Sequence, residues 1–133
     1  MMILHLDDQR FITKHIRDIL TDLGKLDVIY VQSVSEAKEI VASRKDEIGL
    51  ILSDIIMPLE FETDKQLDYY GINTGFRFCK WIKDNYKDIP VWALTVRTDI
   101  TEEELLDGGF EHSFIKPADI FSMVEQIKNR VGK

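Results

Sequence analysis

The chain has one cysteine, three prolines and no long apolar run. The single cysteine, Cys79, excludes an internal disulfide, and its place in the apolar stretch GFRFCKWI predicts a buried thiol in a reducing compartment. No segment approaches the ~20 consecutive apolar residues that a membrane-spanning helix needs. The first residues, MMILHLDDQR, also lack the basic region and the cleavage site of a secretory signal. We therefore expect a cytoplasmic protein with no membrane partner.

Basic residues are in the minority. Lys and Arg number 17 against 24 Asp and Glu, so the net charge is -7 and the pI is about 4.9. This composition offers no basic face for a phosphate backbone, which argues against nucleic acid as a direct ligand. At 133 residues the chain is expected to form one domain, residues 1–133, that buries roughly two thirds of the surface exposed by its unfolded form.

Strand patterns and helix patterns alternate along the chain. Apolar runs predict buried strands over residues 2–6, 26–32, 49–53, 90–95 and about 110–115. Apolar side chains at helical spacing follow each run, over residues 11–23, 34–41, 75–86, 101–108 and 120–131. Such βα units predict an α/β fold of the flavodoxin-like (βα)5 type, with a central five-stranded parallel sheet in the order 2-1-3-4-5.

Local signals mark where several of these helices begin and end. Ser33 with Glu36, and Thr101 with Glu104, have the S/T-x-x-E spacing of a capping box. Gly24 is predicted to be the C-cap of the first helix.

Polar side chains end four of the apolar runs. Asp7 and Asp8 follow the first strand, Asp54 follows the third, Thr95 ends the fourth and Lys116 follows the fifth. Ligands of such sheets bind outside the carboxyl ends of the strands, so these side chains are expected to share one crevice. In the predicted order the third strand lies between the first and the fourth, and Lys116 starts roughly 10 Å from Asp54.

The acidic pair sets a condition on the first strand. Neighbouring residues of a regular strand point to opposite faces of the sheet. Asp7 and Asp8 can therefore share the crevice only if this strand ends near Leu6.

Three carboxylates in one crevice repel each other unless a cation compensates them. An all-oxygen donor set favours Mg²⁺, with Mn²⁺ also suitable, over zinc. Asp54 can then act as a carboxylate nucleophile that forms an acyl phosphate. The Lys116 ammonium and the Thr95 hydroxyl would compensate the phosphoryl oxygens.

The chain resembles the receiver domain of two-component response regulators over nearly its whole length. The matching elements are the pair Asp7-Asp8, the D-x-x-M-P stretch at residues 54–58, Thr95 at the end of a strand, and Lys116-Pro117 after the last strand. The resemblance implies that Asp54 accepts a phosphoryl group from the phosphohistidine of a histidine kinase or phosphotransfer protein. It implies a protein that catalyses its own Mg²⁺-dependent phosphorylation and dephosphorylation, rather than a conventional enzyme.

The resemblance also implies a role for each residue around the acceptor. Asp8, Asp54 and the backbone carbonyl of Ile56 hold Mg²⁺, and Asp7 acts on it through water. Thr95 turns toward the phosphate, and the aromatic residue two positions before the lysine, Phe114, changes rotamer with it.

The implied output is a change in protein binding. A downstream protein would dock on the face formed by the fourth helix, the fifth strand and the fifth helix, and a phosphorylation-dependent homodimer is a second implied outcome. Since the sequence ends at Lys133, just past the last helix, we expect either a regulator that acts alone or part of a longer one.

The sequence departs from the family pattern in three places. The loop between the third strand and third helix, about residues 59–74, is roughly a dozen residues longer than usual, and such loops are usually functional or disordered. It is interpreted either as a solvated acidic loop or as a lid or partner contact that uses Phe61, Tyr69 and Tyr70. Val96 is larger than the usual residue after the threonine. Ile56 and Arg97 lie at positions that influence loss of the phosphoryl group, and we predict a phosphorylated state that persists.

Other interpretations stay open. The same fold could serve as a phosphorylation-independent protein-interaction module, with the Asp-Thr-Lys set reduced to an ion-pair cluster. A haloacid-dehalogenase-like phosphatase would need D-x-D at the first strand, where this chain has D-D-Q-R. His5 is interpreted as a packed or strand-edge side chain rather than a catalytic base, and Trp81 and Trp92 as packing residues.

Overall fold

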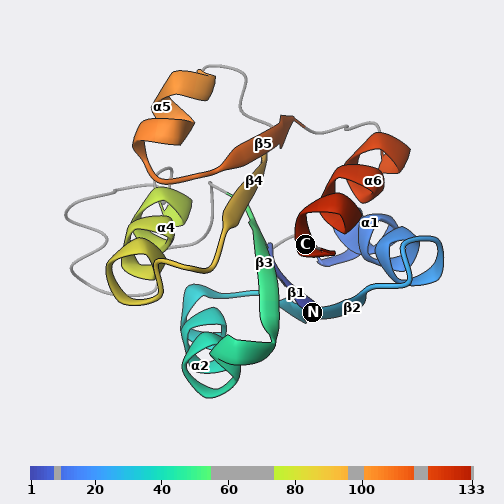
Figure 1. The fold of residues 1–133 in the computed structure, drawn as a ribbon, viewed down its shortest axis with the longest axis horizontal. Helices are drawn as coiled ribbons and strands as arrows, with labels where there is room; N and C mark the ends of the chain where they lie inside the picture. The colour runs from blue at the N-terminus through green and yellow to red at the C-terminus, as the bar shows by residue number, and fades with distance from the viewer. Residues whose placement is uncertain (8–9, 55–73, 96–100, 116–119, 133) are drawn as a thin grey trace.

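The fold is described from a computed structural model that covers residues 1–7, 10–54, 74–95, 101–115 and 120–132, with only the backbone described at residues 10–13, 74, 95 and 115. The strands are β1 (Met2–Leu6), β2 (Asp27–Val31), β3 (Ile48–Ser53), β4 (Val91–Thr95) and β5 (His112–Ile115). The helices are α1 (Arg10–Asp22), α2 (Val34–Arg44), the short 3-10 helix η1 (Lys45–Glu47), α4 (Thr74–Asn85), α5 (Glu102–Asp107) and α6 (Ile120–Val131) (Figure 1).

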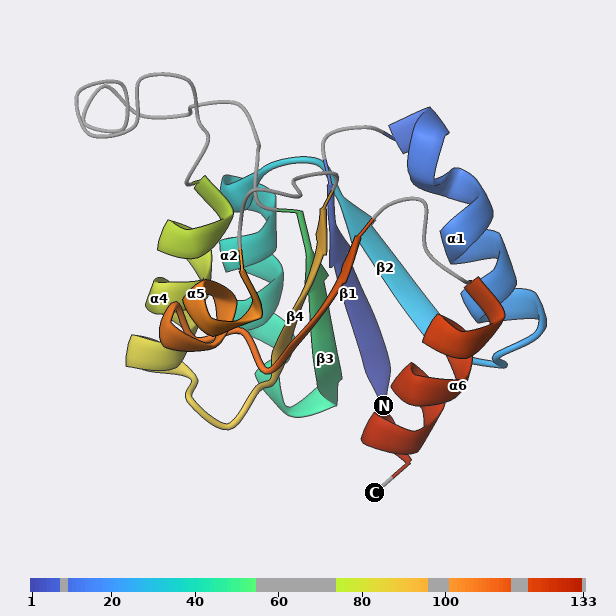
Figure 2. The same ribbon diagram turned by 90° about the horizontal axis from the view of Figure 1, so that it is seen from above.

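The five strands form one parallel sheet in the order β2-β1-β3-β4-β5. This is the predicted flavodoxin-like order, with β3 between β1 and β4. Figure 2 shows α1 and α6 on one face of the sheet, and α2, α4 and α5 on the other. The prediction of an α/β fold with a central parallel sheet is therefore confirmed.

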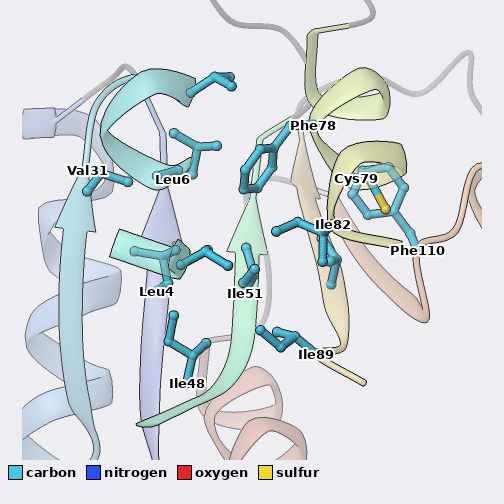
Figure 3. Close-up of a cluster of buried hydrophobic side chains, with 14 of the residues drawn as sticks. Leu4, Leu6, Val31, Ile48, Ile51, Phe78, Cys79, Ile82, Ile89 and Phe110 are labelled. Atoms are coloured by element: carbon cyan, nitrogen blue, oxygen red, sulfur yellow. The ribbon is translucent and has the colours of Figure 1, made fainter. Parts of the chain in front are cut away.

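Each face of the sheet has its own apolar core, since the strands carry apolar side chains in both directions. The larger core lies under α2, α4 and α5 and includes Leu4, Ile51 and Phe78, all almost fully buried (Figure 3). The second core lies under α1 and α6 and includes Leu50 and Leu52. Cys79 lies in the first core, as predicted.

The start of β3 carries a bulge. Met2 pairs with Ile48 while Ile3 pairs with Leu50, which leaves Gly49 between the two pairs. A Cβ atom on Gly49 would lie 2.6 Å from the Met1 Cβ and 3.2 Å from a Val131 methyl carbon. Glycine is needed here because both chain ends approach the backbone at this point.

The helix ends agree with most of the predicted signals. Ser33 caps α2 by accepting the Glu36 N–H, and Thr101 forms a capping box with Glu104. After α1 the left-handed residue is Lys25, at φ 56°, rather than the glycine that precedes it.

Gly24 has a different role from the one predicted. Any Cβ at this position would lie 2.5 Å from the Leu20 carbonyl oxygen, so close packing rather than a left-handed backbone requires glycine.

The predicted ends of β1, β5 and β2 can be compared with the structure. β1 ends at Leu6, as the argument from the acidic pair required. β5 begins at His112, later than the predicted start near residue 110, because Phe110 instead packs in the core under α4 and α5. β2 is shorter by one residue at each end than predicted. Of the long loop predicted at about residues 59–74, residues 59–73 lie outside the described residues, and Thr74 begins α4.

The helices of the described ranges are short or amphipathic. None of them is long and apolar enough to cross a membrane.

Candidate phosphoryl-transfer site

Sheet register brings two of the predicted site residues together. Leu6 of β1 pairs with Ser53 of β3, and the next residues along these strands are Asp7 and Asp54. The Asp54 N–H still donates to the Leu6 carbonyl at 2.9 Å, and the Asp7 N–H donates to the Val31 carbonyl at 3.2 Å. Since adjacent strands lie ~4.8 Å apart, the two aspartates leave the sheet side by side.

Both carboxylates are buried. Asp7 is 0% exposed and Asp54 is 6% exposed. Every second residue of a strand faces the same side of the sheet. Asp7 therefore lies on the side that Ile3 faces, and Asp54 on the side that Leu52 faces, which in both cases is the side covered by α1 and α6. Burying two like charges at neighbouring positions is costly unless cations or hydrogen-bond donors compensate them. The arrangement is therefore that of an ionic site rather than of a packing core.

A hydroxyl fixes the backbone beside the predicted acceptor. The Ser53 Oγ donates to the Asp54 carbonyl at 2.8 Å, and Ser53 is fully buried. This bond satisfies a buried carbonyl at the point where the chain leaves β3.

The other two strands end at the same edge of the sheet. Thr95 of β4 pairs with Ile115 of β5, so Lys116 follows directly after a residue paired with Thr95. The backbone thus carries Thr95 to the carboxyl edge that Asp7 and Asp54 share. The remaining predicted site residues lie outside the described residues: Asp8, Ile56, Val96, Arg97 and Lys116.

Phe114, predicted as a switch residue, lies in a ring cluster on the α1 and α6 side of the sheet. It pairs with Leu94 in register, and its ring meets those of Trp92 and His112 at centroid distances of 5.8 Å and 4.8 Å. The ring is partly buried against the second core. A change of rotamer, as predicted for Phe114, would break these ring contacts.

Sequence reasoning missed a group of side chains directly behind Asp7. His5 is fully buried, and its Nε2 lies 4.0 Å from the Asp7 Oδ2. Arg17 of α1 and Tyr30 of β2 complete the group. The available signal was a histidine inside an otherwise apolar central strand, but its neighbours come from elements whose packing the sequence does not specify.

The donor chemistry of the described part of the site fits a hard cation. Asp7 and Asp54 supply carboxylate oxygens, which Mg²⁺ and Mn²⁺ prefer. Within the described residues, no three His, Cys, Asp or Glu side chains gather in a way that could hold a metal ion. The other predicted ligands, Asp8 and the backbone carbonyl of Ile56, lie outside these ranges.

Solved structures share this fold. A response regulator from Chloroflexus aurantiacus J-10-fl superposes with a TM-score of 0.77 at 21% identity, over 99% of this chain and 98% of that chain. The receiver domain of a Francisella response regulator gives 0.76 at 20% identity, over 98% and 95%. A response regulator receiver domain protein from Clostridium thermocellum gives 0.77 at 21% identity, over 98% and 93%. At these identities the likeness concerns the fold alone.

The amino-acid sequence was also compared with curated proteins and with protein families. The comparison with curated proteins found no match. The family described as the response regulator receiver domain matches residues 3–128, which include all of β1 except Met2 and the described carboxylates at both strand ends. The chain therefore belongs to the response regulator receiver domain family.

Proposed function

We propose that this receiver takes a phosphoryl group onto Asp54 from a histidine kinase or phosphotransfer protein and thereby changes its binding to a partner. The observation that supports the proposal is the pair of buried carboxylates, Asp7 and Asp54, at the ends of adjacent central strands. Receiver domains as a family interact with histidine kinases or phosphotransfer proteins and with downstream effectors. A cytoplasmic location, expected from the sequence, is part of the proposal.

The transfer step is a displacement at phosphorus. An Asp54 carboxylate oxygen attacks the phosphorus of the donor phosphohistidine, and the phosphorus–nitrogen bond breaks. The electron pair stays on that imidazole nitrogen, and a proton carried by the other ring nitrogen keeps the leaving imidazole neutral, so the products are an aspartyl phosphate and a neutral histidine. Because this reaction depends mostly on positioning and charge, the chain catalyses its own modification without acting as a conventional enzyme.

The proposed metal site is formed by Asp8, Asp54 and the backbone carbonyl of Ile56, with Asp7 acting on the ion through water. Receiver domains use Mg²⁺ at the phosphorylation site, and Mn²⁺ has the same preference for oxygen ligands. When bound, the ion supplies positive charge beside the carboxylates and the phosphoryl oxygens. Lys116 and Thr95 are proposed to contact the remaining phosphoryl oxygens.

Three further residues are proposed to set how long the phosphate lasts. Ile56 would exclude the attacking water, Val96 would narrow the approach to Thr95, and Arg97 would pair with acidic groups of the loop at about residues 59–74. The low exposure of Asp54, at 6%, supports slow hydrolysis. A lifetime of seconds for the Mg²⁺-bound phosphoprotein would contradict this part of the proposal.

The face formed by α5, β5 and α6 is proposed as the output surface. Leu106 of α5 is 60% exposed and Phe121 of α6 is 69% exposed, and large exposed apolar side chains often mark binding surfaces. Leu106, Phe110 and His112 line a groove between α5 and β5. The switch from Asp54 would pass through Thr95 and Phe114, and a homodimer through the same face is a second outcome.

Mass spectrometry after incubation with acetyl phosphate and Mg²⁺ tests the proposal. We expect one added phosphoryl group on the wild-type protein and none on Asp54→Asn. Asp22→Asn, at an exposed position in α1, is the matched control and should be modified like the wild type. An unmodified wild-type protein with native circular dichroism would overturn the proposal and favour a phosphorylation-independent interaction module.

A further inference from the structure

His5 lies behind the candidate site, between the side chains of Arg17 and Asp7. Its Nδ1 is 3.3 Å from an Arg17 guanidinium nitrogen, and its Nε2 is 4.0 Å from the Asp7 Oδ2. The imidazole is fully buried in β1, where its backbone pairs with Tyr30 of β2 and Leu52 of β3. A polar ring in the central strand of a parallel sheet is unusual, because both faces of such a strand are normally apolar.

The contact with Arg17 fixes the tautomer of His5. A guanidinium only donates hydrogen bonds and has no acceptor atom. The His5 Nδ1 must therefore accept, which places the ring proton on Nε2, the atom that faces Asp7. At 4.0 Å this N–H and the carboxylate interact electrostatically rather than through a formed hydrogen bond.

Tyr30 contacts both the backbone of Asp7 and the side chain of Arg17. Its hydroxyl donates to the backbone carbonyl of Asp7, and its ring lies under the Arg17 guanidinium at 3.8 Å. The cation–π contact limits where the guanidinium can lie, and the hydroxyl fixes the backbone from which the Asp7 carboxylate projects. One group of contacting side chains thus runs along the α1 face of the sheet, from Arg17 to the crevice.

The geometry points to His5 as a positioning residue for the Asp7 carboxylate, with Arg17 setting its tautomer and Tyr30 fixing Arg17. At 4.0 Å the Nε2–H attracts the nearer Asp7 carboxylate oxygen electrostatically and so helps to hold the carboxylate at the crevice. Outer-shell groups that orient the carboxylates around a metal ion influence metal affinity in this way. The inference rests on the proposed function in one respect only, that Asp7 serves the divalent cation.

The tautomer can be read on the metal-free protein. In a nitrogen–proton NMR correlation of the imidazole, we expect the His5 proton on Nε2 in the wild type. Arg17→Met keeps much of the apolar stem but removes the donor, and we expect it to yield a mixture of tautomers. A proton on Nδ1 in the wild type, or an unchanged pattern in Arg17→Met, would overturn the inference.

Metal affinity gives the second measurement, with Mn²⁺ as the probe and the electron paramagnetic resonance of the free ion as the signal. We expect His5→Leu to weaken Mn²⁺ binding about tenfold. His5→Gln, whose amide can donate near the position of Nε2, should recover most of the affinity. Ile3→Val changes packing on the same face of β1 without touching this group, and should bind Mn²⁺ like the wild type.

The two proposals fail separately. If the wild type takes up phosphate but His5→Leu and the wild type bind Mn²⁺ equally, or if the wild type binds no Mn²⁺, only the role of His5 is overturned. If Asp54 takes up no phosphate while Mn²⁺ binding still depends on His5, the role of His5 stands and the proposed function fails. Near-ultraviolet circular dichroism checks that each variant is folded, and the tautomer measurement stays informative if His5→Leu does not fold.

Discussion

At the scale of single residues, burial sets the chemistry of Cys79. Burial raises the pKa of the Cys79 thiol to about 12, although the nearby Lys83 ammonium acts in the opposite direction. The folded protein should therefore react with a thiol reagent at pH 8 far more slowly than after unfolding in urea. As Cys79 is the single cysteine of the sequence, the absorbance of released thionitrobenzoate reports this site alone. Equal rates in the folded and unfolded protein would contradict the burial.

The same pKa shift has a consequence for stability. The thiol ionises near pH ~8.5 in an unfolded chain but only near 12 in the folded protein. The contribution of the buried neutral thiol to the free energy of unfolding is thus fully present below pH ~8.5. It is lost as the pH rises through the folded-state pKa. We expect Cys79→Ala to flatten this alkaline loss of stability, measured by urea unfolding.

The carboxylate of Glu111, the residue before β5, accepts hydrogen bonds from both α6 and β4. Arg130 of α6 donates to both of its oxygens, at 2.7 Å and 3.0 Å, and the Trp92 Nε1–H donates at 2.7 Å. The Arg130 hydrogen bonds lower the pKa of Glu111, and the Trp92 bond adds to this against the effect of burial. The stability from this group is present above the unfolded-state pKa and lost as the pH falls through the lower folded-state pKa.

We therefore expect Glu111→Gln to cost about 1 kcal/mol of unfolding free energy at pH 7, because the side chain is partly exposed and its charge is screened. The difference from the wild type should shrink as the pH falls below the folded-state pKa. Urea unfolding at several pH values measures it. Glu125→Gln, at an exposed position in α6, is the control, and an equal cost there would show that the effect is not specific to Glu111.

Sequence patterns predicted residue roles well where burial alone decides them. The burial of Cys79 and the packing of Trp92 follow from apolar surroundings that the sequence displays. The contacts of His5 could not be predicted, since they depend on which turn of α1 lies over β1. A lysine in the left-handed region, Lys25, was equally unpredictable because glycine was the expected residue.

At the scale of the elements, α5 depends on its cap. The helix has 6 residues, too few to be stable by propensity alone. Thr101 accepts the Glu104 N–H at 3.1 Å, and the Glu104 side chain lies 3.5 Å from the Thr101 N–H. We expect Thr101→Ala to cost about 1 kcal/mol in denaturant unfolding. Thr21→Ala, at an exposed position in α1, should change the free energy by less than ~0.5 kcal/mol.

The order and type of the elements could be predicted because the spacing of apolar residues and the capping residues mark the strands and helices in the sequence. Element ends were less predictable, as at β5, where Phe110 packs into the core before the strand begins. For the site, the sequence predicted the tips of the strands, and register places Asp7 beside Asp54. The proposed roles of Asp8, Ile56, Val96, Arg97 and Lys116 stay predictions.

At the scale of the whole molecule, a cation bound at Asp7 and Asp54 would tie β1 to β3, the pair of strands at the centre of the sheet. A ligand that binds only the folded state adds about 2.7 kcal/mol at a concentration of 100 times its Kd. We therefore expect Mg²⁺ to raise the thermal midpoint of the wild type, measured by calorimetry against the same protein in chelator. Asp7→Asn and Asp54→Asn should lose most of this shift. A similar rise in both variants would place the ion elsewhere.

The bulge at Gly49 has a practical consequence. Met1 and Val131 both lie close to this glycine, so the two ends of the chain lie near each other at the amino edge of the sheet, opposite the crevice. A donor and an acceptor fluorophore attached to these ends would transfer energy efficiently in the native protein and lose that transfer when the chain expands. Such a labelled protein would report folding in single molecules while leaving the phosphoryl-transfer edge untouched.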